Sequence, residues 1–246
     1  MRLVVRSVSR FLILLLLPTI QGCGSESLGE GDTDMDSDTV TFLALGDSYT
    51  IGESVDEVER WPVLLASALE GSGFAVRDPI IIARTGWTTD ELAVGIQEAG
   101  LTGTFDVVSL LIGVNNQYRG RDPEEYRIQF IDLLSQAVTF AGGNAERVLV
   151  LSIPDWGVTP FAEGRDRGRI GSEIDAFNET NRIESRRAGV LYLDITGISR
   201  EAATDLSLVA EDGLHPSGAM YALWAEAALP LVLGVLKSPT GNGGPP

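Results

Sequence analysis

Short apolar runs alternate with longer amphipathic segments between residues 40 and 237 of the chain. The runs are rich in Val, Ile and Leu, and few polar residues interrupt them. This pattern is typical of strands in a parallel sheet that is buried on both faces. We therefore predict five strands, over residues 40–45, 80–83, 107–112, 148–153 and 190–195.

The segments between these runs have helical periodicity. Asp122 can cap a helix over residues 123–140, where apolar side chains recur every three to four positions. Thr89 can cap another helix, and Pro230 should kink or interrupt the last one. The remaining predicted helices cover residues 62–69, 89–98, 165–187 and 216–236.

Strand and helix alternate throughout residues 40–237, which predicts a single α/β domain. We expect a three-layer α/β/α sandwich with a five-stranded parallel sheet at its centre. Pro79 lacks an N–H at the start of the strand over 80–83, so this strand is predicted to lie at an edge. A length of 246 residues with 44% hydrophobic residues fits one folded domain.

Residues 1–22 resemble the signal peptide of a bacterial lipoprotein. Three arginines precede an apolar run over 11–17 that is too short to span a bilayer. Cys23, the only cysteine, directly follows residues 1–22, so we expect it to be lipidated and to become the mature N-terminus. The chain is then exported to the cell envelope, in the periplasm or on the outer-membrane face. Two alternatives stay open: ordinary signal cleavage near Gly22 or Gly24, and a buried free thiol at Cys23.

The segment from 23 to 39 is predicted to be an acidic, flexible tether, because it carries six acids and no base. Residues 238–246 are predicted to form a disordered tail. The formal net charge is −17, and loss of residues 1–22 with their three arginines makes it −20. So acidic a surface repels nucleic acid, and we exclude nucleic-acid binding.

Two loops after predicted strands carry a nucleophile and a base. Ser48 lies in the motif Gly46-Asp47-Ser48-Tyr49, which directly follows the strand over 40–45, and ligands of open α/β sheets bind beyond the carboxyl ends of strands. His215 is the only histidine, and Asp212 lies three residues before it. A serine nucleophile needs such a base and an acid that fixes the imidazole tautomer. Each motif alone fits an ordinary turn or a structural histidine, whereas their combination favours catalysis.

Two further loops offer donors to a developing oxyanion. Asn115 follows the strand over 107–112, and Gly86 follows the strand over 80–83. A side-chain amide and a backbone N–H can both stabilise negative charge on a carbonyl oxygen. One histidine and one cysteine make a zinc site improbable. We therefore expect no metal and no organic cofactor.

Four motifs follow one another along the chain: Gly46-Asp47-Ser48, the glycine loop with Gly86, Gly113-x-Asn115, and Asp212-x-x-His215. In this order they resemble the motifs of the SGNH hydrolases, also called GDSL esterases, over roughly residues 40–235. The resemblance implies a flavodoxin-like form of the predicted fold. It assigns the nucleophile, base and acid to Ser48, His215 and Asp212, and the oxyanion hole to Ser48, Gly86 and Asn115. Asn116 departs from the family, which often has Asp there. The Gly-x-Ser-x-Gly elbow of α/β-hydrolases is absent.

The resemblance implies a serine ester hydrolase, and its leading version is a lipase or lysophospholipase-like esterase. One alternative is a carbohydrate O-acetylesterase, and another is a catalytically inactive, lipid-anchored binding protein. Trp87, Tyr118 and Trp156 either line a substrate pocket or pack the loops that carry them. We expect a monomer whose partners are an ester substrate, of small-molecule, lipid or glycan type, and a membrane through the anchor.

Overall fold

The computed structural model describes residues 39–238, which form the predicted five-stranded parallel sheet. The strand order is β4-β2-β5-β6-β7, so β4 lies at an edge as Pro79 predicts. The predicted signal peptide, Cys23 and nearly all of the predicted tether and tail lie outside the described residues. The strands are β2 (Phe42–Gly46), β4 (Ile80–Ala83), β5 (Val107–Leu111), β6 (Val148–Leu151) and β7 (Leu191–Leu193).

A second, two-stranded parallel sheet joins β1 (Thr39–Val40) to β3 (Ala75–Val76). The predicted strand over 40–45 therefore begins too early, because Val40 pairs with Val76 rather than within the large sheet. Thr41 separates the two sheets, and it donates from both its N–H and its hydroxyl to Asp106.

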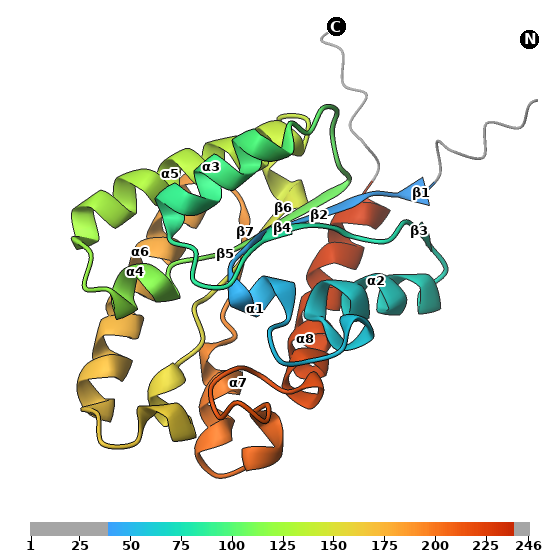
Figure 1. Ribbon diagram of the computed structural model, residues 1–246. Coiled ribbons are helices and arrows are strands. Elements are labelled where there is room, and N and C mark those ends of the chain that lie inside the picture. The colour runs from blue at the N-terminus through green and yellow to red at the C-terminus, as the bar shows by residue number, and fades with distance from the viewer. Residues whose placement is uncertain (1–38, 239–246) are drawn as a thin grey trace, which may run out of the picture. The chain divides into compact units, whose positions relative to one another are not determined.

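Helices cover both faces of the large sheet, as Figure 1 shows. Helices α3 (Thr89–Ala99), α5 (Pro123–Phe140) and α6 (Arg167–Ala188) form one layer. Helices α2 (Trp61–Gly71) and α8 (Gly218–Lys237) pack against each other in the opposite layer. The predicted three-layer α/β/α sandwich is confirmed. The shorter helices are α1 (Ser48–Ile51), α4 (Val114–Tyr118) and α7 (Thr196–Arg200).

Six 3₁₀ turns complete the described elements. They lie mostly in the loops at the carboxyl ends of the strands. They are η1 (Glu57–Glu59), η2 (Ala145–Arg147), η3 (Trp156–Val158), η4 (Pro160–Ala162), η5 (Glu201–Ala203) and η6 (Leu206–Leu208).

The core lies between the helix layers. Every residue of β2, β5 and β6 is buried, which explains why their sequences read as continuous apolar runs. On the α2–α8 side, Trp61 and Trp224 are fully buried. The Phe42 ring lies 6.1 Å from that of Trp61, and the Tyr49 ring lies 6.3 Å from that of Trp224. The first contact packs α2 on β2, and the second packs α1 against α8.

Helix boundaries agree with the sequence in one case and correct it in two. Asp122 caps α5 by accepting from the N–H groups of Glu124 and Glu125, as predicted. Helix α3 is capped one residue earlier than expected, because Thr88 forms the capping box with Glu91. Helix α8 runs through Pro230 without interruption. Pro230 is exposed, so the carbonyl that loses its helix donor can be hydrated instead.

Among the described helices, only α8 is long and apolar enough to cross a membrane by length and composition. Its buried residues include Tyr221, Trp224 and Ala228, which belong to the hydrophobic core. Helix α8 therefore packs as a core helix of the domain.

Candidate active site

Ser48 lies at the turn between β2 and α1. Asp47 caps this turn, since its Oδ1 accepts from the N–H of Tyr49 at 3.1 Å. Gly46 is required because a Cβ there would lie 2.1 Å from Thr50 Oγ1 and 2.5 Å from the carbonyl oxygen of Leu111. The tight turn places Ser48 at the carboxyl end of the sheet, where the residue is 5% exposed.

The Asp47 carboxyl is almost completely buried, at 1% exposure. Its Oδ2 has no hydrogen-bond partner among residues 39–238. Burial raises the pKa of Asp47 to about 7, although the Tyr49 N–H partly opposes the shift by donating to the charged form. The residue before Ser48 therefore holds a carboxyl that exchanges its proton near neutral pH.

His215 and Asp212 form a close pair in the loop before α8. The distance from His215 Nδ1 to Asp212 Oδ2 is 2.5 Å, and the edge of the Tyr49 ring contacts the imidazole at a centroid distance of 5.6 Å. Because the carboxylate accepts from Nδ1–H, the neutral imidazole carries its free lone pair on Nε2. This tautomer is the one that a general base acting on a serine requires.

Asp212 receives donors on both carboxylate oxygens. Oδ1 accepts from the N–H groups of Leu214 at 2.8 Å and His215 at 2.9 Å. Oδ2 accepts from the hydroxyl of Ser54 at 2.7 Å in addition to the imidazole. Partial burial raises the pKa of Asp212, but these hydrogen bonds outweigh it and hold the pKa far below its usual value. Asp212 is therefore ionised at neutral pH.

Ser48 and His215 line the same pocket. No hydrogen bond joins Ser48 Oγ to the imidazole among the described residues. Such bonds are often long in free enzymes and tighten once substrate is bound.

The candidates for the oxyanion hole line the same pocket as Ser48. Asn115 and Gly86 both line it, at the ends of β5 and β4. The Asn115 amide uses one hydrogen to donate to the Trp87 carbonyl at 2.9 Å, which orients the side chain and leaves the second hydrogen available. Gly86 has φ of +87°, a conformation that favours glycine. Within residues 39–238, the N–H groups of Ser48 and Gly86 donate to no other residue.

Asn116 fastens the two oxyanion loops together. Its Oδ1 accepts from the Thr89 N–H at 3.1 Å, and its Nδ2 donates to the Thr89 hydroxyl at 2.8 Å. An Asp could accept the first bond, while the Asn amide also satisfies the hydroxyl. The departure from the usual family residue therefore preserves the link between α4 and the start of α3.

The pocket has a volume of about 190 Å³ and an aromatic wall. Tyr118, Trp156 and Phe161 form this wall, with ring centroids 5.5–6.4 Å apart. The Arg165 guanidinium lies 4.9–5.4 Å from the centroids of the three rings and braces them from outside the pocket lining. Two of the predicted substrate residues, Tyr118 and Trp156, thus lie beside Ser48.

Trp87, the third predicted substrate residue, is not among the residues that line this pocket. Its indole packs over α3, where a Cβ at Gly95 would lie 2.1 Å from the ring. The Trp87 ring therefore packs against α3, in agreement with the packing role that the sequence left open.

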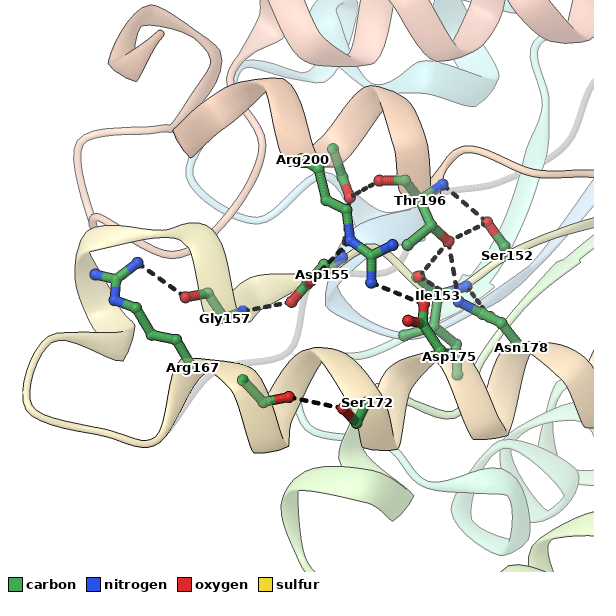
Figure 2. A network of polar contacts seen from close by, with 12 residues as sticks. Ser152, Ile153, Asp155, Gly157, Arg167, Ser172, Asp175, Asn178, Thr196 and Arg200 are labelled. Atoms are coloured by element: carbon green, nitrogen blue, oxygen red, sulfur yellow. Dashed lines mark hydrogen bonds and ion pairs between the residues drawn. The ribbon is translucent and has the colours of Figure 1, made fainter. Parts of the chain in front are cut away.

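A polar network holds the loop that carries Trp156 (Figure 2). Arg200 of α7 donates to Asp155 Oδ2 at 2.9 Å and to Asp175 of α6 at 2.7 Å. Asp155 Oδ1 accepts from the Gly157 N–H at 2.9 Å. The loop that carries Trp156 is therefore tied to α6 and α7.

Sequence reasoning did not single out Tyr49, Ser54 or Leu214. Tyr49 and Leu214 line the pocket through positions adjacent to Ser48 and His215, so the motifs themselves could have indicated them. Ser54 lies in a polar loop without any motif. Within the described residues, no cluster of three or more His, Cys, Asp or Glu side chains could hold a metal ion.

A serine, an imidazole and a carboxylate gathered at the carboxyl edge of a parallel sheet are the parts of a serine hydrolase. Residues 44–223 match the family described as the GDSL-like Lipase/Acylhydrolase family. The chain belongs to this family and is a carboxylic ester hydrolase.

Solved structures of the same fold cover most of the chain. TesA shares 19% identity at a TM-score of 0.62, over 79% of this chain and 99% of its own. The acetylxylan esterase Axe2 from Geobacillus stearothermophilus shares 18% identity at a TM-score of 0.61, over 78% and 94%. LAE5, an alpha/beta hydrolase from the Lake Arreo metagenome, shares 23% at a TM-score of 0.60, over 81% and 97%. At these identities they show the fold alone. No curated protein matches the chain significantly.

Proposed function

We propose that the chain cleaves carboxylic esters through an acyl-enzyme on Ser48, as a lipase or lysophospholipase-like esterase. The observation that carries this proposal is the shared pocket. It brings Ser48 together with an imidazole whose Nδ1 is held by an ionised carboxylate at 2.5 Å.

In the first half of the reaction, Ser48 Oγ attacks the ester carbonyl carbon while His215 Nε2 takes the hydroxyl proton. The carbonyl oxygen becomes an oxyanion, which accepts from the N–H groups of Ser48 and Gly86 and from the Asn115 amide. Asp212 stabilises the imidazolium. The intermediate then expels the alcohol, whose oxygen receives the proton from His215.

The second half repeats these steps with water. His215 takes a proton from the water, whose oxygen attacks the acyl carbon. The bond to Ser48 Oγ breaks, the proton passes to Oγ, and the carboxylic acid leaves. All proton transfers use His215, and no cofactor takes part.

The lining of the pocket supports an acyl substrate. Leu214, Val114 and the aromatic wall provide an apolar surface beside Ser48. Apolar walls with few polar groups are typical of small-molecule sites, and burial contributes about 0.8 kcal/mol per methylene.

A carbohydrate O-acetylesterase is the second candidate. Tyr118 is 48% exposed and Phe161 is 39% exposed, so the outer part of the wall offers ring surface to a sugar. The structural likeness to an acetylxylan esterase points in the same direction.

The test compares the wild type with Ser48→Ala on 4-nitrophenyl esters of increasing acyl length. We expect the variant to lose hydrolysis of every ester and to lose labelling by a fluorophosphonate probe. Ser67→Ala is the matched control, because Ser67 is exposed on α2.

The outcomes separate the candidates. Rising kcat/KM with acyl length and release of fatty acid from a lysophospholipid support the lipid esterase. Hydrolysis restricted to acetyl esters, with release of acetate from acetylated xylo-oligosaccharides, favours the glycan esterase. Full activity of Ser48→Ala contradicts the mechanism, and an unlabelled, inactive wild type favours a binding protein.

We also propose that a lipid on Cys23 holds the enzyme at the cell envelope. The support is the sequence of residues 1–23, with its basic start and apolar run. Cells fed a labelled fatty acid should incorporate it into the wild type. Cys23→Ser should lack the label and leave the membrane fraction, whereas a labelled variant contradicts the assignment.

A further inference from the structure

Ser54 has an unusual backbone conformation. Its φ is +67°, and it is the only residue other than glycine with positive φ within residues 39–238. A side chain in this region costs on the order of 1 kcal/mol relative to glycine. Such strain persists where the surrounding structure holds it, and it tends to occur at functional sites.

The strained loop makes two contacts that reach other loops of the pocket. Ser54 donates its hydroxyl to Asp212 Oδ2 at 2.7 Å, across 158 positions of sequence. The neighbouring Glu53 accepts a hydrogen bond from the hydroxyl of Thr85, which lines the pocket beside Gly86. The loop of Glu53 and Ser54 therefore contacts both Asp212 and the glycine loop.

We propose that Ser54 is a positioning residue that holds Asp212 against His215. The proposal rests on the function assigned above to Asp212 and His215. Ser54 reaches the same oxygen that accepts from the imidazole, whereas the two backbone donors reach the other oxygen. Within residues 39–238, the Ser54 hydroxyl is therefore the one donor to Oδ2 besides the imidazole.

Without the Ser54 hydroxyl, Asp212 Oδ2 keeps only the His215 imidazole as a donor within residues 39–238. The Asp212 carboxylate can then rotate about Oδ1, which the two backbone N–H groups hold. The imidazole then loses a fixed orientation toward Ser48. A hydrogen bond to a charged group corresponds to about 10- to 100-fold in an equilibrium or a rate. We expect kcat to fall within this range, with KM unchanged, because Ser54 lies outside the pocket lining.

The experiment separates the hydroxyl from the strain by using three variants. Ser54→Ala removes the hydroxyl and keeps the side chain at positive φ. Ser54→Gly removes the hydroxyl and relieves the strain, and Ser54→Thr keeps the hydroxyl while adding strain. We measure kcat and KM on a 4-nitrophenyl ester, the rate of fluorophosphonate labelling, and the urea midpoint of unfolding.

We expect Ala and Gly to lose kcat and labelling rate equally, although Gly raises the urea midpoint. Thr should keep kcat while its midpoint falls. If Ser54 acts only through stability, kcat should instead follow the urea midpoint: the Gly variant should keep kcat and the Thr variant should lose it. Wild-type kcat in the folded Gly variant overturns the proposal.

Ser207→Ala is the matched control. Ser207 also donates its hydroxyl to a carboxylate, Asp205, at 2.6 Å, but it lies outside the pocket. Its removal should leave kcat unchanged. If Ser48→Ala remains active, the assigned mechanism itself fails. If Ser48→Ala is inactive and Ser54→Gly is fully active, only the role of Ser54 is wrong.

Discussion

The stability of Asp47→Asn relative to the wild type should increase with pH. The folded state raises the pKa of Asp47 from 3.8 to about 7, because burial disfavours the carboxylate. The native state therefore binds a proton more tightly than the unfolded chain does. The contribution of Asp47 to stability is therefore greatest below about pH 4 and falls as pH rises to about 7, above which the loss is constant.

The size of this loss follows from the shift. A difference of about 3 pKa units corresponds to about 4 kcal/mol, taken as an upper limit for a side chain buried this completely. Asn carries no charge and keeps the Oδ1 acceptor for the Tyr49 N–H. Its Nδ2 replaces the unpaired Oδ2 and needs an acceptor, which adds a cost that does not depend on pH.

Urea unfolding of both proteins from about pH 4.5 to about pH 7.5 checks this prediction. The difference in unfolding free energy, Asn variant minus wild type, should increase by up to about 3 kcal/mol across this range, since part of the full effect lies outside it. A difference that is flat or falls would refute the reasoning. Asp205→Asn is the control: hydrogen bonds from Ser207 lower the pKa of Asp205. The contribution of Asp205 to stability therefore changes with pH mainly below about pH 4. The difference in unfolding free energy between Asp205→Asn and the wild type should stay flat above that pH.

Three further substitutions test the site and its supports. Asn115→Ala should lower kcat about 10²- to 10³-fold, measured on a 4-nitrophenyl ester, and a change in KM alone would contradict an oxyanion role. Gly46→Ala should lower the free energy of unfolding by about 1–3 kcal/mol or more, because its Cβ would lie 2.5 Å from the Leu111 carbonyl oxygen. A wild-type urea midpoint would show that the turn relaxes. Arg200→Leu leaves Asp155 Oδ2 buried without its partner and should cost about 1–3 kcal/mol in the same assay. Unchanged stability would indicate that solvent replaces Arg200.

The large sheet was predictable from sequence because its central strands are buried on both faces. Burial on two faces leaves a continuous apolar run that few other structures require. The small sheet of β1 and β3 was not predictable, since two-residue strands carry no periodicity. Pro230 does not interrupt α8, because the cost of a helix proline depends on whether solvent reaches the freed carbonyl.

The residues of the candidate site also differ in how far the sequence predicts them. Ser48 and His215 follow from sequence, because a single imidazole and a serine after a strand leave few other combinations. Ser54 does not, because its contact needs a left-handed backbone and a partner 158 positions away. The place of Trp87 depends on packing against Gly95, which no local pattern records.

The hydrogen bond between Ser54 and Asp212 has a consequence for folding. It joins two loops near opposite ends of the domain, and helices α2 and α8 must pack together on the sheet to bring those loops close. Contacts between residues so far apart in sequence form slowly, because loop closure costs entropy before any interaction is gained. During refolding, helix and strand signals should therefore recover before hydrolysis does. The return of activity would mark the moment at which the loops of Ser54 and Asp212 meet.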